Sequence, residues 1–429
     1  MRIFNLQTTY IITIIVSLFI YVPNTVFSTI IVPSDPSLTG PFAVSRHVIP
    51  GTVTTRNMTV EVWYPSSPNA TTGKDPVVYD LREHLPPDMA AKLKGSVEEL
   101  GISQTCDMLN GNPQCFNELP FEIPSSDDDI KKRPVILFIH GTGAWRGQSL
   151  QSVAHWVSRG FVVVAADYPG INLKDLLENI DFHKHGKVPK INQSGDTILL
   201  YNALQEAQQQ QQGEAKKNIR VEEHDARFDF FINHVNLSHV AIIGHSAGAF
   251  AVDELSLAGV GNVFVPMAGL GTNITTRKPL KQFMNNYTTL ILGGENDTID
   301  TMGAEHGWTQ TKSPPNGPPK RYALVKDLGH HFCDDICAIG AAKGGIVAIA
   351  KNAGIWQASL MAKLANNGCQ FTNSSFADPK TGWEFVNYAT SAVLENYFYQ
   401  DESMVEKLQN FEKVKPSLVL TYKEALYND

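Results

Sequence analysis

Ser246 is the residue of this sequence best placed to do chemistry, because it stands in the segment Gly244-His245-Ser246-Ala247-Gly248. The apolar run Val240–Ile243 precedes this segment and small residues follow it, which predicts a strand, a sharp turn and a helix. Glycines two positions to either side of the serine leave room for a strained turn that exposes its hydroxyl. The pattern therefore indicates a nucleophile that attacks a carbonyl carbon.

A serine hydroxyl reacts at neutral pH only beside a base, and that base needs an orienting acid. Asp297 is the predicted acid, because it closely follows the expected strand Thr289–Leu292 at the sheet edge where such sites form. Glu295 and Asp300 are the alternatives.

The predicted base is His330, which follows Gly329 on the loop after the expected strand Tyr322–Val325. The next residue, His331, is the alternative, since two adjacent residues of one type compete for one role. A metal site built from these histidines with Asp334 and Asp335 is disfavoured, because neighbouring side chains rarely converge on one ion.

Catalysis at a carbonyl also needs hydrogen-bond donors for the negative charge that develops on its oxygen. The glycine-rich turn His140-Gly141-Thr142-Gly143 follows a buried strand, and the backbone N–H groups of Thr142 and Ala247 are the expected donors. His140 and His245 each stand beside a turn, where we expect them to brace the backbone.

Two aromatic residues follow strand ends on the same edge and are candidates to line a substrate pocket. They are Trp145 and Tyr168, and the alternative for each is packing in the core. None of the expected chemistry requires a metal ion or an organic cofactor.

The elements that must position these residues are short apolar runs that alternate with helical patterns from residue 134 onward. This alternation is typical of right-handed crossovers, and it predicts an α/β fold with a mostly parallel, doubly wound sheet flanked by helices. The expected strands are Thr54–Tyr64, Val135–Ile139, Phe161–Ala166, Val240–Ile243, Val263–Pro266, Thr289–Leu292 and Tyr322–Val325, and the expected helices are Ser149–Arg159, Thr197–Gln212 and Glu222–Val235.

We expect one domain over residues 29–429, with an insertion at about residues 80–130 that contains a helix-like piece over Pro87–Leu100. This insertion and the glycine- and alanine-rich stretch Ala338–Ile355 are candidate lids. Cys106 and Cys115 flank a turn-rich stretch and are expected to form a local disulfide. Cys369 is expected to pair with Cys337 or Cys333, and the alternative is that all five cysteines remain thiols.

Residues 1–28 carry Arg2 as their one charge and are apolar over Ile11–Val22, which predicts a cleaved secretory signal peptide. An uncleaved anchor is the alternative, since Gln7–Val22 approaches the length of a membrane span. No other segment is apolar for long enough to span a membrane. Export also agrees with eight N-x-Ser/Thr glycosylation sequons, at Asn57, Asn69, Asn192, Asn236, Asn273, Asn286, Asn296 and Asn373, of which Asn296 is discounted because it adjoins Asp297.

The composition is that of an ordinary globular protein, with 43% hydrophobic and 18% charged residues. A net charge of −8 disfavours nucleic acid as the main partner. The expected partner is a small-molecule, lipid-like or polymeric ester, because the predicted nucleophile Ser246 acts on a carbonyl carbon. Oligomeric state is not indicated by the sequence.

The chain resembles the α/β-hydrolase superfamily, and within it the branch of dienelactone hydrolases, platelet-activating-factor acetylhydrolases and cutinase-like polyester hydrolases. The matching segments are Val60–Pro65, His140–Gly143, Gly160–Gly170, Gly244–Gly248 and Gly294–Thr298. The resemblance covers about residues 45–400 and implies that Ser246, Asp297 and the residue after His140-Gly141 act as nucleophile, acid and first oxyanion donor. The insertion at 80–130 and the doubled histidine depart from the family pattern.

The expected function is thus that of a secreted serine hydrolase, an esterase or lipase-like enzyme, acting on a carboxylic ester. A secreted binding protein without turnover on the same fold is one alternative, since fold does not fix function. An acyltransferase that uses the same three residues is another.

Overall fold

The computed structural model describes residues 32–51, 56–107, 109, 113–123, 132–179, 190–211, 226–269, 287–301, 303–310 and 317–425. The expected signal peptide and the sequons at Asn273 and Asn286 lie outside these residues. From Val32 onward the chain forms one compact unit.

A ten-stranded mixed sheet is the centre of this unit, in the order β12-β11-β10-β9-β8-β6-β7-β2-β1-β5. The six strands from β11 to β7 are mutually parallel, while β12 and β2 run antiparallel to the strands beside them. Their bounds are β1 Ala43–Ile49, β2 Val60–Ser66, β5 Cys115–Asn117, β6 Arg133–Ile139, β7 Val162–Ala166, β8 Val235–His245, β9 Val263–Met267, β10 Thr288–Gly294, β11 Lys320–Val325 and β12 Val419–Ala425.

The parallel strands were expected from their apolar runs, and all of these predictions are confirmed. Every residue of β6 is buried, and its side chains alternate between two hydrophobic clusters. Ile136 and Phe138 face one cluster, whereas Val135, Leu137 and Ile139 face the other. A strand that is buried on both faces has no polar side, which explains its continuous apolar sequence.

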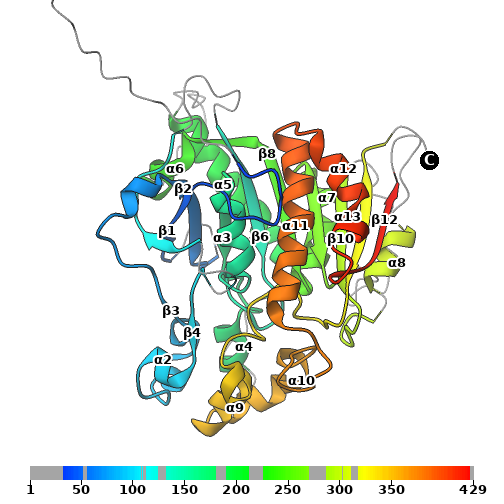
Figure 1. Ribbon diagram of the computed structural model, residues 1–429. Helices are drawn as coiled ribbons and strands as arrows, with labels where there is room; N and C mark the ends of the chain where they lie inside the picture. The colour runs from blue at the N-terminus through cyan, green and yellow to red at the C-terminus, as the bar shows by residue number, and fades with distance from the viewer. Residues whose placement is uncertain are drawn as a thin grey trace, which may run out of the picture. The chain divides into compact units, whose positions relative to one another are not determined.

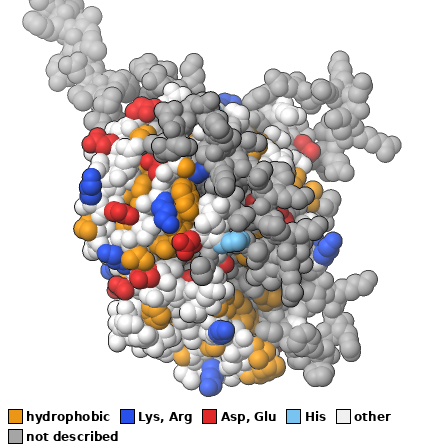
Figure 2. All heavy atoms as spheres, turned by 90° about the vertical axis from the view of Figure 1, so that its right-hand side faces the viewer, with side chains coloured by type: hydrophobic (Ala, Val, Ile, Leu, Met, Phe, Trp, Pro, Cys, Tyr) orange, Lys and Arg blue, Asp and Glu red, His pale blue; other side chains and the backbone are white. Residues whose placement is uncertain are grey.

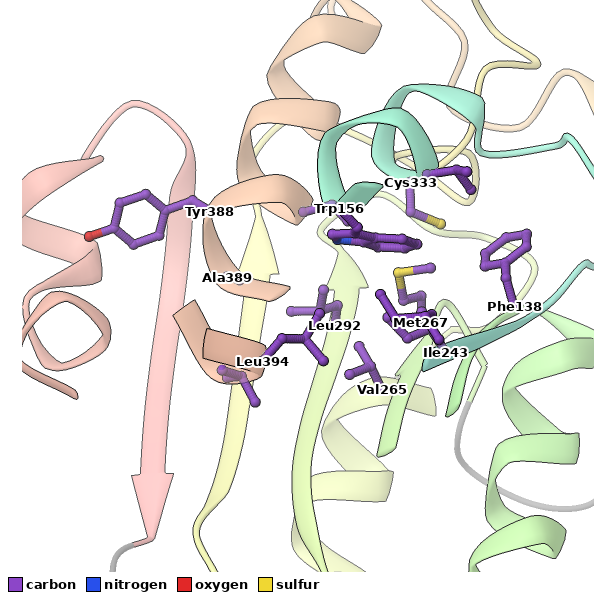
Figure 3. Close-up of a cluster of buried hydrophobic side chains, with 14 of the residues drawn as sticks. Phe138, Trp156, Ile243, Val265, Met267, Leu292, Cys333, Tyr388, Ala389 and Leu394 are labelled. Atoms are coloured by element: carbon purple, nitrogen blue, oxygen red, sulfur yellow. The ribbon is translucent and has the colours of Figure 1, made fainter. Parts of the chain in front are cut away.

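Helices cover both faces of the sheet, as a doubly wound arrangement requires (Figure 1). On one face, α3 (Leu150–Ser158) and α11 (Pro379–Phe398) pack on the strands, and Trp156 of α3 lies among Phe138, Ile243 and Met267 (Figure 3). On the other face lie α5 (Gln193–Gln211) and α7 (Ala247–Leu257).

Shorter elements connect this framework, and no described helix is long and apolar enough to cross a membrane. The helix expected over 87–100 is two separate four-residue helices, because Gly95 adopts a positive φ between them. The helix expected over 222–235 is described only from Ala226, as a 3₁₀ turn and a short helix, and β8 begins at Val235. The remaining bounds are β3 Tyr79–Asp80, β4 Ser103–Gln104, α1 Pro87–Ala90, α2 Val97–Leu100, α4 Leu173–Asn179, α6 Asp229–Ile232, α8 Gly303–Gln310, α9 Gly345–Asn352, α10 Ala362–Ala365, α12 Ser403–Gln409, α13 Phe411–Val414, and the 3₁₀ helices Pro68–Thr71, Leu81–His84, Ala226–Phe228, Ala341–Lys343 and Trp356–Met361.

The two candidate lid segments pack against each other beside the carboxyl ends of the parallel strands. The segment with α1 and α2 and the segment with α9 and α10 share a third hydrophobic cluster, and both lie at the lower end of Figure 1. Hydrophobic side chains are also exposed at the lower end of the face in Figure 2. Trp356 and Leu360, in the 3₁₀ helix that follows α9, are 53% and 60% exposed. These segments thus form an apolar layer of their own at the edge where the predicted site residues lie.

Two disulfides tie these segments to the main body. Cys106 bonds Cys115, as expected, and Cys369 bonds Cys337 rather than Cys333. Cys333 is a buried free thiol. Burial raises its pKa well above the ordinary thiol value, which keeps the thiol protonated and inert.

Candidate active site

The nucleophile turn joins β8 directly to α7 at Ser246. This serine has φ 55° and ψ −116°, a conformation that a residue with a side chain adopts only under strain. A Cβ at Gly244 would overlap the carbonyl of Gly248, and a Cβ at Gly248 would overlap the carbonyl of Ile139. The two glycines therefore let helix and strand close around the serine, whose side chain stays only half-buried.

Ser246, His330 and Asp297 lie in one hydrogen-bonded line, although they come from three distant segments. Nε2 of His330 is 2.9 Å from Oγ of Ser246, and Nδ1 of His330 is 2.8 Å from Oδ2 of Asp297. With the Nδ1 proton donated to the carboxylate, Nε2 is free to accept the serine proton. This is the geometry of an activated nucleophile.

The Asp297 carboxylate is held in place by the loop that carries it. Its Oδ1 accepts hydrogen bonds from the backbone N–H groups of Ile299 and Asp300, at 2.8 and 3.0 Å. Burial alone would raise the pKa of Asp297, but the hydrogen bond and charge of His330 outweigh it, and the pKa is lowered. Glu295, an alternative acid, is exposed and accepts from the N–H of Asp327 instead.

The backbone of His330 is fixed on both sides. Its N–H donates to Oδ1 of Asn367 at 3.0 Å, and its carbonyl oxygen accepts from Nε2 of His245 at 3.0 Å. Asn367 also donates to the Thr298 hydroxyl, so it joins the histidine loop to the loop that carries Asp297. The roles of Asn367 and His245 at His330 were not predicted, because only contacts between distant parts of the sequence identify them.

His331 points away from the serine and forms a buried ion pair. Its Nδ1 donates to Asp334 and its Nε2 donates to the carbonyl of Leu364, both at 2.7 Å. Burial lowers the pKa of His331, but these two partners raise it by more, so the net shift is upward. Burial likewise raises the pKa of Asp334, yet His331 outweighs it and the pKa falls to about 2.

The glycine-rich loop after β6 lies directly against the nucleophile. A Cβ at Gly141 would stand 3.1 Å from Cβ of Ser246. The N–H of Ala247 begins α7 and so has no acceptor within that helix. No described residue accepts a hydrogen bond from the N–H of Thr142. Both amides are therefore available to a ligand oxygen.

A single buried side chain, Gln148, connects the loops around the serine. Its Oε1 accepts from the N–H of Gly141 at 2.9 Å. Its Nε2 lies 2.7 Å from both Nδ1 of His245 and Oδ2 of Asp334. Burial lowers the pKa of His245 to about 3, so this imidazole is neutral and accepts at Nδ1 while it donates at Nε2.

His140, like His245, bonds the backbone of the loops beside it. Its Nδ1 donates to the carbonyl of Gly141 at 2.8 Å, and its Nε2 accepts from the N–H of Tyr168 at 3.1 Å. Burial lowers the pKa of His140, which keeps the ring neutral for this pair of contacts.

Trp145 and Tyr168 are both 1% exposed and pack inside the protein. Trp145 stacks on His84 and Tyr168 lies against His140, and its hydroxyl accepts from Thr197. An apolar pocket does open beside Thr142, but neither aromatic residue lines it. Its walls come instead from the two lid segments and α4.

His245, His331 and Asp334 approach one another closely enough to suggest a metal-binding group. Their facing atoms are already engaged, because Asp334 accepts from His331 and Gln148, while His245 accepts from Gln148. A metal would have to displace these bonds. The group fits a hydrogen-bonded support for the loops better than a cation site.

Comparison with known protein families finds no family model that matches this chain, and comparison with curated proteins finds none with significant sequence similarity.

Proposed function

We propose that this protein is a serine hydrolase that cleaves a carboxylic ester through an acyl-enzyme on Ser246. The observation that carries the proposal is the position of His330, which hydrogen-bonds Ser246 at 2.9 Å and Asp297 at 2.8 Å. Such a line of nucleophile, base and acid serves proton transfer from the hydroxyl during attack on a carbonyl.

In the proposed reaction Oγ of Ser246 attacks the acyl carbon while Nε2 of His330 takes its proton. The ionised Asp297 stabilises the imidazolium, which then protonates the leaving alcohol. The N–H groups of Thr142 and Ala247 donate to the oxyanion of the tetrahedral intermediate. Water, activated by the same histidine, releases the acid, and no step calls for a metal or an organic cofactor.

The proposal extends to family and location. A sheet with a parallel centre, together with the chain order of serine, aspartate and histidine, supports membership of the α/β-hydrolase superfamily. Two disulfides and the apolar N-terminal segment support a location outside the cell, with an N-terminal membrane anchor as the alternative.

The test combines a fluorophosphonate probe with hydrolysis of p-nitrophenyl esters, on wild-type protein and Ser246→Ala. We expect the wild type to be labelled and to turn over, and the variant to lose labelling and about 10⁴-fold or more of kcat. Equal turnover by the variant would refute the role of Ser246. A folded wild type that is neither labelled nor active would favour a binding protein, and faster product formation with added alcohols would favour an acyltransferase.

A further inference from the structure

An apolar pocket opens beside the proposed oxyanion donor Thr142 and has no role in the mechanism so far. Its space is about 710 Å³ when the open mouth is included. Apart from Thr142, Gly143 and His331, all of its lining residues are leucine, isoleucine, valine, alanine or methionine.

Apart from Thr142, the pocket walls offer nothing to a polar ligand. His331 is the one ionisable lining residue, and both of its ring nitrogens are already engaged by Asp334 and Leu364. A polar group that enters such a pocket loses its water without gaining a partner, so its burial is unfavourable. An alkyl chain, in contrast, gains free energy with every methylene that it buries.

The walls are contributed by two segments that lie far apart in the sequence. Leu93 and Ile102 come from the insertion, and Ile349 and Ile355 come from the segment with α9. Nζ of Lys92 donates to the carbonyl of Gly354 at 3.2 Å across the seam between them. Residues of both segments are therefore needed to form the pocket.

The position of the pocket relative to the triad decides which end of an ester enters it. Gly141 lies against Ser246, and the next residue, Thr142, lines the pocket. A carbonyl oxygen bound at the Thr142 N–H would bring the acyl carbon near Ser246 and one end of the ester next to the pocket. The leaving alcohol must lie at His330, which is not a lining residue.

We infer that this pocket binds the aliphatic acyl chain of the substrate, so that the protein prefers esters of medium-length or longer linear fatty acids to acetates. The inference rests on the proposed function. Each added methylene of the acyl chain is expected to raise kcat/KM about three- to fourfold until the pocket is filled. The gain from butyrate to octanoate is then about 10²-fold.

Two ester series test the inference on the full-length mature protein. One varies the acyl chain of p-nitrophenyl esters from acetate to palmitate, and the other varies the alkanol of acetate esters over the same lengths. We expect a steep rise in kcat/KM in the first series and a nearly flat profile in the second. A flat acyl profile, or selection by alkanol length, overturns the inference.

The variant Ala350→Phe fills the pocket from α9, and Ala358→Phe fills it from the neighbouring 3₁₀ helix. Ala348→Phe is the matched control, because Ala348 lies on α9 and is also half-buried but does not line the pocket. We expect either pocket variant to lose about 10²-fold in kcat/KM for octanoate and less than about threefold for acetate. Equal losses in the control variant, or no loss in the pocket variants, contradict the inference.

Fluorophosphonate labelling separates the two possible failures. Labelling of Ser246 with a flat acyl profile refutes the pocket assignment and leaves the hydrolase proposal standing. Absence of both labelling and hydrolysis refutes both.

Discussion

The adjacent residues His330 and His331 differ in their hydrogen-bond partners, and we expect them to differ in their roles for that reason. His330 lies between a serine hydroxyl and a carboxylate, whereas His331 lies between a carboxylate and a backbone carbonyl. A carbonyl oxygen can only accept a hydrogen bond, so His331 must donate at both nitrogens and has no lone pair to take a proton. These contacts support the proposal that His330 is the base, and they give His331 a structural charge.

Substitution of each histidine separates these tasks. His330→Ala removes the proposed base and is expected to lower kcat about 10⁴-fold or more with little change in thermal stability. His331→Gln retains hydrogen-bonding groups and is expected to keep kcat within about tenfold while it lowers the melting temperature. Steady-state kinetics and calorimetry on both variants measure the split. The opposite pattern, with His331→Gln the inactive variant, would reassign the base.

The buried His331–Asp334 pair also predicts how stability depends on pH. The pKa of His331 is raised above its ordinary 6.5, so its contribution is complete below about pH 6.5 and is lost as the pH rises through the raised value. The pKa of Asp334 is lowered from 3.8 to about 2, so its contribution is lost only as the pH falls below 3.8.

The difference in unfolding free energy between wild type and His331→Gln should therefore be largest between about pH 4 and 6.5. It should shrink steadily at higher pH, because the glutamine side chain does not titrate. Urea unfolding of both proteins at a series of pH values measures this difference. A difference that is constant from pH 5 to 9 would mean that folding does not shift the pKa of His331.

Among the elements, the site depends on the loops that follow β6, β8, β10 and β11. These loops must keep fixed positions relative to one another. Gln148, just before α3, bonds the backbone after β6, the histidine before Ser246 and the carboxylate after His330. Because its amide group is buried and planar, a shift of any one loop strains the bonds to the others. We regard Gln148 as a positioning residue, since it does not touch the reacting atoms.

Gln148→Ala is expected to lower kcat by about 10- to 10²-fold with a small change in KM, because misplacement of catalytic groups by about 1 Å has effects of this size. Gln151→Ala is the matched control. Gln151 is also buried near the start of α3, but its side chain bonds Thr105 and Leu109 of the insertion. A loss of kcat in the control equal to that in Gln148→Ala would show a general effect on α3 rather than positioning.

Elements differ in how far the sequence alone identifies them. The central strands were predicted because burial on both faces requires uninterrupted apolar runs. The outer strands β1 and β12 were missed, because charged residues such as Arg46 and Lys423 interrupt their apolar patterns. β5 was missed because it is three residues long.

For the site, motif and chain order were sufficient to select Ser246 and Asp297 as candidates. They were not sufficient to choose between His330 and His331, because that choice depends on Leu364, which is 33 residues away in the sequence. The position of the apolar pocket was likewise not predictable, because its walls come from segments near residues 93 and 349 that are far apart in the sequence. Contacts between distant segments are the information that local patterns lack.

Over the molecule as a whole, one disulfide links stability to the geometry of the proposed triad. Cys369 follows Gly368, which packs so closely on Gly329 that neither position has room for a Cβ. Gly329 precedes His330, and Asn367 accepts from the His330 N–H. The bond from Cys369 to Cys337 thus anchors the segment that holds the loop with His330.

Removal of this disulfide by Cys337→Ala with Cys369→Ala is expected to lower both stability and kcat. For cysteines 32 residues apart in the sequence, the chain-entropy estimate is about 4 kcal/mol. The matched control is Cys106→Ala with Cys115→Ala, where the separation of 9 residues corresponds to about 3 kcal/mol. The control should therefore lose comparable stability but keep its kcat, because Cys106 and Cys115 do not support the histidine loop. Calorimetry and ester hydrolysis well below both melting temperatures make the comparison, and equal kcat in the two double variants would show that the Cys337–Cys369 bond acts on stability alone.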